Sequence, residues 1–122
     1  MTLTADALPV FEKARFDELA AELDSRAHAL DFAAEFLHLL PRRIRSITIT
    51  VEAGQAEAAH VALVSLAASA GTVGALRLEE DARLADREIR AGHLADARDT
   101  IPQLGRDAEA VTHAIEGLLG RH

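Results

Sequence analysis

The chain has 122 residues, a formal net charge of −7 and no cysteine. This length is enough for one domain with a substantial core, and the lack of cysteine excludes disulfides, thiolate catalysis and thiolate metal sites. The acidic balance argues against nucleic-acid binding, because the only tight basic cluster is Arg42, Arg43 and Arg45, with no aromatic residues interleaved. Ala, Leu, Glu, Asp and Arg predominate, and there are three prolines, which is typical of a helical bundle.

The sequence shows neither a secretion signal nor a membrane-spanning segment. Met1 to Val10 lacks a basic segment followed by an apolar one, and no run of about 18 apolar residues occurs later. We therefore expect a soluble, cytoplasmic protein without a membrane partner. Residues 1–10 are expected to form a leader, and residues 11–122 a single helical domain.

The first predicted helix is short. Phe16, Leu19 and Leu23 recur at helical spacing, which predicts a helix over about 11–23. Ser25 follows as an N-cap signal and marks the start of a second helix.

The second helix is predicted to be long and kinked. Pro41 predicts the kink, because proline lacks a backbone N–H and crowds the preceding turn. The β-branched alternation over 46–51 is also typical of a strand, but an isolated strand is unstable and the helical stripe continues through it in phase. We therefore predict helix up to Ala53, with Gly54 as its C-cap. The apolar stripe consists of Ala29, Ala33, Phe36, Leu37, Leu40, Ile44, Ile47 and Val51.

The third and fourth helices are predicted on either side of a glycine-containing break. We expect the third over about 55–70 and place its end at Gly71–Thr72, because glycine is a poor helix former. The fourth is expected to begin at Thr72 or Gly74 and to run to a C-cap at Gly92.

The last part of the chain is predicted to be one helix or a pair of helices over about 94–120. A kink or break is expected near Thr100, because Pro102 restricts the residues before it. Short connections make neighbouring helices antiparallel. The predicted fold class is therefore all-α: an up-down bundle of four helices with a short additional N-terminal helix.

Two Glu-x-x-His patterns, Glu35…His38 and Glu57…His60, are similar to the metal-binding pattern of carboxylate-containing helical bundles. If the chain folds back at Gly54, His38 lies about 15 residues from the turn and His60 about 6, which places them roughly 13 Å apart in height. The two histidines then cannot share a metal ion. We expect neither a metal nor a cofactor.

The sequence does not predict an enzyme. No nucleophile, base and orienting residue occur in a recognisable pattern, and the glycines at 71 and 74 lack the preceding strand and following lysine of a phosphate-binding loop. The acidic run Glu79, Glu80 and Asp81 is expected to be a solvated helix face.

The predicted third helix has one apolar face and one face with almost no bulk. Small side chains let another molecule come close to the helix backbone, so we predict that the second face binds a partner. This face consists of His60, Val64, Ala67, Ala68 and Gly71, opposite apolar residues at 63, 66, 70 and 73.

Residues 64–75 resemble the signature of histidine-containing phosphotransfer (HPt) domains. That signature reads approximately His-x-Leu-Lys-Gly-Ser-Ala-x-x-x-Gly-Ala, and a more general similarity covers about 16–117. The resemblance implies a helical bundle in two-component phosphorelay signalling, with receiver domains of response regulators or histidine-kinase modules as partners. The matching residues are Leu66, Ser69, Ala70, Gly74 and Ala75.

The same register implies that the reactive residues are missing. The phosphoaccepting histidine falls on Val64, the lysine that helps neutralise the phosphoryl group falls on Ala67, and the glycine that lets a partner approach falls on Ala68. Valine has no nitrogen to phosphorylate, and alanine has no charge. We therefore expect a degenerate HPt-like protein that docks receiver or other signalling domains without carrying a phosphoryl group at this position. A buried Val64 would contradict this interpretation.

Two alternatives stay open. His60, one turn before Val64, is a backup phosphoacceptor, although it lies roughly 6 Å from the family position along the helix axis, which would misalign in-line transfer. The other alternative is a purely structural or oligomerising bundle. The chain is expected to be a monomer or a homodimer.

Overall fold

The computed structural model describes residues 5–120, and every regular element in that range is a helix. This confirms the predicted all-α fold class. The elements are a 3₁₀ turn η1 (Ala5–Ala7) and five α-helices: α1 (Lys13–Glu22), α2 (Arg26–Glu52), α3 (Ala56–Val73), α4 (Leu76–Arg90) and α5 (Leu94–Leu119).

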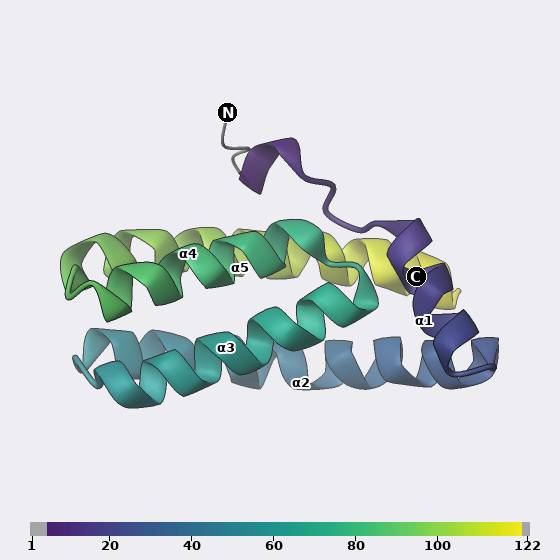
Figure 1. Cartoon of the computed structure of the whole chain (residues 1–122), viewed down its shortest axis with the longest axis horizontal. Coiled ribbons are helices and arrows are strands. Elements are labelled where there is room, and N and C mark those ends of the chain that lie inside the picture. Colours follow the sequence, from purple (N-terminus) through teal and green to yellow (C-terminus); the bar gives the residue numbers. More distant parts are fainter. Residues whose placement is uncertain (1–4, 121–122) are drawn as a thin grey trace.

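Helices α2 to α5 form the up-down core of the molecule. Each of them packs against the next in the chain, and α5 packs back on α2, so that the four helices enclose one core. Figure 1 shows α3 and α4 in front, α2 and α5 behind, and α1 at the end of the bundle where α2 begins and α3 ends. Helix α1 contacts both α2 and α3, while η1 lies against α4.

Helix α2 confirms the prediction of a long helix over the β-branched segment. It begins after Ser25, whose Oγ accepts a hydrogen bond from the backbone N–H of His28 at 3.0 Å. It continues across Pro41 and ends before Gly54, which has a left-handed φ of 70°. The strand alternative for 46–51 is wrong, because these residues continue the same buried face.

One predicted helix end is wrong. Helix α3 continues through Gly71 to Val73, and the chain turns at Gly74, which has φ 101°. The sequence contains a glycine at both positions, but only the second one takes the left-handed conformation that glycine tolerates best. Helix α5 is a single helix across Pro102, which is one of the two alternatives predicted for 94–120, and it has no break near Thr100.

The core is apolar and continuous through the bundle. By length and composition alone α3 could cross a membrane, but seven of its residues are buried in this bundle, as in the core helix of a globular domain. The largest fully buried side chains are Phe16, Leu40, Ile47, Leu63, Leu66, Leu78, Leu104 and Ile115.

Two carboxyl groups lie inside this core, between α4 and α5. Asp81 is 5% exposed and Asp107 is 3% exposed, and the Oδ2 atom of each has no hydrogen-bond partner among the described residues. Gln103 Nε2 donates to Asp107 Oδ1 at 2.8 Å. Burial, followed by the neighbouring Asp107 carboxyl group, raises the pKa of Asp81 from 3.8 to about 7.

The expectation of a fully solvated acidic face over Glu79, Glu80 and Asp81 is therefore wrong for Asp81. This residue lies three positions after Leu78 and four before Ala85, on the buried stripe of α4. Glu79 and Glu80 are partly exposed.

Candidate functional site

The signature-like segment 64–75 covers the second half of α3 and its turn into α4. Leu66, Ala70 and Ala75 are fully buried, so these residues of the signature are part of the bundle core. Ser69 Oγ accepts a hydrogen bond from Arg43 Nη1 at 2.9 Å, which ties α3 to α2.

Gly74 has two structural reasons to be glycine. Its φ of 101° is strained for any residue with a side chain, and a Cβ would lie 2.6 Å from the carbonyl oxygen of Glu12. The backbone N–H of Glu12 donates to the carbonyl of Gly74 at 2.7 Å. The matching residues of the signature therefore hold α3 in position against α1, α2 and α4.

Val64, which the sequence resemblance assigns to the position of the family histidine, is 42% exposed. Val64 is therefore not buried in the core, whereas burial of this side chain would contradict the resemblance. Val61, one turn earlier, is also exposed, and Ala68 and Thr72 continue the same stripe toward the end of α3. We call Val61, Val64, Ala68 and Thr72 the docking face.

This face is narrower than the sequence predicts. Ala67 is only 1% exposed, and Gly71 is buried as well, so neither residue adds appreciable exposed surface to this face. The reason is that α3 packs between α2 and α4 and is covered on both flanks. The Glu79 side chain lies over Gly71 so closely that a Cβ there would clash with its carboxylate.

His60 stands at the edge of the docking face and is half-buried. Its Nδ1 lies 2.6 Å from Asp86 Oδ1, and its Nε2 lies 3.2 Å from Arg90 Nη1. Arg90 can only donate and the Asp86 carboxylate accepts, so these contacts fit the tautomer in which Nδ1 donates and Nε2 accepts. His60, Asp86 and Arg90 form a three-residue chain that joins α3 to α4.

Sequence reasoning named His60 but missed Asp86 and Arg90. These two residues are four apart and therefore share one face of α4, but charged pairs at this spacing are common on solvated helices. Only the antiparallel packing of α4 on α3 places that face against His60.

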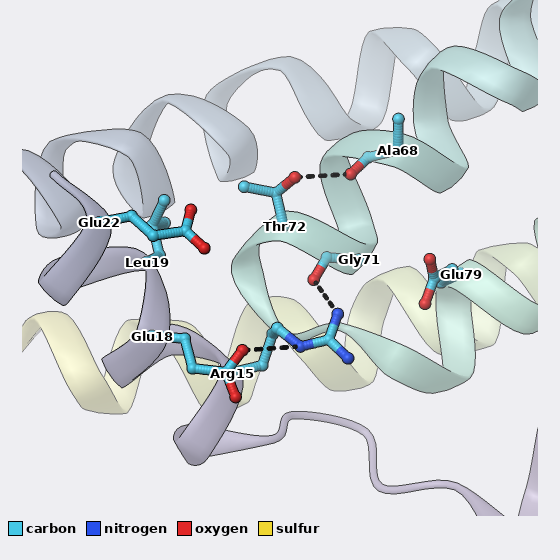
Figure 2. Close-up of a pocket in the computed structure, with 8 residues that line it drawn as sticks. All are labelled: Arg15, Glu18, Leu19, Glu22, Ala68, Gly71, Thr72 and Glu79. Atoms are coloured by element: carbon cyan, nitrogen blue, oxygen red, sulfur yellow. Dashed lines mark hydrogen bonds and ion pairs between the residues drawn. The ribbon is translucent and has the colours of Figure 1, made fainter.

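A cavity of about 320 Å³ continues the docking face toward α1. Figure 2 shows its walls: α1 on one side, the end of α3 behind, and Glu79 from α4 on the far side. Arg15 Nη1 donates to the carbonyl of Gly71 at 3.2 Å, and its Nε lies 3.6 Å from Glu18 Oε2. The cavity is lined by Arg15, Glu18, Leu19, Glu22, Ala68, Gly71, Thr72 and Glu79.

The acidic and histidine residues of the described chain do not gather into a metal site. No group of three or more His, Asp or Glu side chains between residues 5 and 120 is placed to hold a metal ion. His38, the partner in the first Glu-x-x-His pattern, is exposed on α2.

Comparison with known proteins identifies the fold. No protein-family model and no curated protein sequence matches the chain. The crystal structure of histidine-containing phosphotransfer protein B (HptB) from Pseudomonas aeruginosa PAO1 superposes with a TM-score of 0.84 at 20% sequence identity, over 93% of this chain and 97% of that chain. The chain therefore has an HPt-like fold. At this identity the comparison shows the fold and not the chemistry, so the function of this HPt-like bundle has to be argued from its own residues.

Proposed function

We propose that this HPt-like protein acts in two-component phosphorelay signalling by docking a receiver domain of a response regulator, or another signalling domain, on its docking face. It carries no phosphoryl group at Val64. The observation that supports this proposal is the exposure of Val64, 42%, at the register position of the family histidine, on a helix whose signature-like residues all serve to hold it in place.

The chemistry of the face fits binding without transfer. Val61 and Val64 offer exposed apolar surface, and Ala68 is small enough for a partner backbone to come close. A valine side chain has no lone pair to attack phosphorus, and the buried Ala67 has no charge with which to neutralise a phosphoryl group. A receiver bound here would be sequestered rather than dephosphorylated by transfer. We place this activity in the cytoplasm, without a membrane or nucleic-acid partner.

A titration of the labelled protein with receiver domains from the same organism tests the proposal. We expect at least one receiver to shift the amide signals of Val61, Val64 and Ala68. A Val64→Lys variant should bind that receiver about tenfold or more weakly, because it replaces apolar contact by a charge that must be desolvated.

The matched control is Ile49→Lys, since Ile49 is 57% exposed on α2, away from the docking face. Its affinity for the receiver should equal that of the unaltered protein. If no receiver perturbs the signals around Val64, the docking proposal is wrong. If sedimentation shows a dimer that Val64→Lys dissociates, the docking proposal is replaced by the structural or oligomerising alternative.

One observation favours a second candidate function, phosphoryl transfer through His60. The Asp86 carboxylate accepts a hydrogen bond from Nδ1, with Oδ1 and Nδ1 2.6 Å apart, which leaves Nε2 as the nucleophilic nitrogen, and Arg90 Nη1 supplies a positive charge 3.2 Å from it. The Nε2 lone pair would form the P–N bond while the P–O bond to the donor's aspartyl carboxylate breaks and that carboxylate leaves. Arg90 would move from Nε2 to the phosphoryl oxygens.

Incubation with a phosphorylated receiver separates the two candidates. Transfer through His60 predicts an acid-labile label that disappears in His60→Ala, persists in His93→Ala and falls about tenfold or more in Asp86→Asn, because the ring loses the carboxylate that orients it. An unlabelled protein that still binds the receiver supports docking alone. A label that survives His60→Ala excludes His60 as the acceptor.

A further inference from the structure

We propose that the groove between α2 and α5 binds a basic amphipathic helix of a partner protein. This groove is separate from the docking face. The docking face lies on α3, beside α4, whereas α2 and α5 form the side of the bundle behind them (Figure 1).

The groove consists of two cavities that meet at Ile44 and Gly105. Their volumes are about 430 and 380 Å³, and together they run along most of the α2–α5 seam. The floor is apolar, as the bound face of an amphipathic helix requires. Leu40, Pro41, Ile44 and Ala108 line one part, and Val51, Ile101 and Pro102 line the other.

Gly105 makes the centre of the groove hollow. It lies inside α5, where glycine is the least favourable residue after proline, and a Cβ at this position would meet no described atom within 4 Å. The fold of a single chain therefore gives no steric reason for glycine here. A partner helix that crosses at Gly105 would gain from the missing side chain, because its own side chains could reach the backbone.

On the rim of the groove, three carboxylates outnumber the basic side chains Arg98 and His113. Glu109 and Glu116 stand along one part, and Glu52 stands at the other end. The one arginine in the lining, Arg98, already donates to the carbonyl of Glu52 at 3.1 Å. The carboxylates complement lysine or arginine side chains on the polar edges of a bound helix.

The two prolines of the groove change the backbone hydrogen bonding of α2 and α5. Pro41 and Pro102 have no N–H, so they cannot donate to the carbonyls of Leu37 and Arg98 one turn before them. Each of these carbonyls therefore lacks the usual helical hydrogen bond from the residue four positions later.

Charge also decides between a foreign helix and a second copy of the chain. A symmetric dimer through this groove would bring the same acidic rims together, and the chain as a whole carries a net charge of −7. The repulsion disfavours a second copy, whereas a basic helix relieves it. The partner that fits is therefore apolar on one face and rich in Lys or Arg beside it.

A fluorescent peptide of about 18 residues, built from Leu and Lys at helical spacing, is a direct probe of this groove. We expect it to bind the full chain with a change in anisotropy. A Gly105→Phe variant should weaken binding about tenfold or more, because its side chain fills the site of the peptide's apolar face. Gly117→Phe is the matched control, since Gly117 also lies in α5 with no described atom within 4 Å of its Cβ position, and should bind normally.

A second pair of variants tests the proposal if Gly105→Phe does not fold. Glu109→Lys should weaken peptide binding about threefold or more, whereas Asp99→Lys on the same helix should have a smaller effect. The proposal is overturned if a Leu/Glu peptide binds equally well, or if both members of each pair behave alike. It is also overturned if sedimentation shows a dimer that Gly105→Phe dissociates, since the occupant would then be a second copy.

Discussion

A single side chain, Asp81, makes the stability of this molecule depend on pH. Its carboxyl group is buried beside that of Asp107, with the charges of Asp6 and Glu80 nearby, and its pKa is raised from 3.8 to about 7. Between these two values the folded state keeps a proton that the unfolded state has released. The contribution of Asp81 to the free energy of unfolding is therefore present in full below pH 3.8, and it is lost as the pH rises through 7.

An Asp81→Asn variant should not lose stability in this way as the pH rises. An asparagine amide can donate to Asp107 Oδ2, which has no partner among the described residues, and it carries no charge at any pH. We expect the variant to be more stable than the unaltered protein by roughly 2 kcal/mol at pH 8, with the difference shrinking toward pH 4. Urea unfolding followed by circular dichroism at several pH values measures it. An equal pH slope in both proteins would contradict the assignment, and Asp99→Asn on exposed α5 surface is the control.

Individual residues also show where sequence reasoning reaches its limit. A helical wheel correctly places Val64 outside the core, but it puts Ala67 and Gly71 on the same open face. The width of the buried stripe depends on how many helices pack against α3, and this information is tertiary. The same holds for His60, whose contacts Asp86 and Arg90 are brought to it by α4.

At the scale of the elements, glycines have opposite effects depending on where they lie in a helix. Gly74 ends α3 in the left-handed region, and a Cβ there would meet backbone at 2.6 Å. We expect Gly74→Ala to destabilise the protein by about 2 kcal/mol or more. Gly105 lies inside α5 with open space around it, so Gly105→Ala should stabilise the protein by about 1 kcal/mol.

Thermal unfolding of the two alanine variants tests this contrast directly. The same chemical change should lower the melting temperature at position 74 and raise it at position 105. A loss of stability at both positions would mean that the glycine at 105 serves the folded chain itself, which would also remove one argument for the groove.

The helix boundaries follow from the same local physics, which explains why most of them could be predicted. Ser25, Gly54 and Gly92 mark helix ends in the sequence and in the structure. The predicted end of α3 differs from the observed one because Gly71 and Gly74 lie three residues apart, and composition cannot show which of them is left-handed. The choice is made by packing, since α1 approaches the backbone at Gly74.

At the scale of the whole molecule, the closed ring of four helices separates two binding surfaces. The docking face lies on α3 beside α4, and the groove lies between α2 and α5 (Figure 1). A receiver domain and a basic helix could thus occupy one bundle together without touching. The HPt-like fold would then serve as an adaptor that holds a receiver next to a second protein.

We predict that the two surfaces act independently, because they share no residue and changes at distant sites in a rigid bundle are usually additive. Saturating the protein with a receiver should leave its affinity for the Leu/Lys peptide unchanged within about twofold. Val64→Lys should reduce receiver binding only, and Gly105→Phe should reduce peptide binding only. Fluorescence anisotropy with each ligand, alone and in the presence of the other, measures all four affinities. Competition between receiver and peptide would show that both use one surface, and would contradict the separation of the two faces.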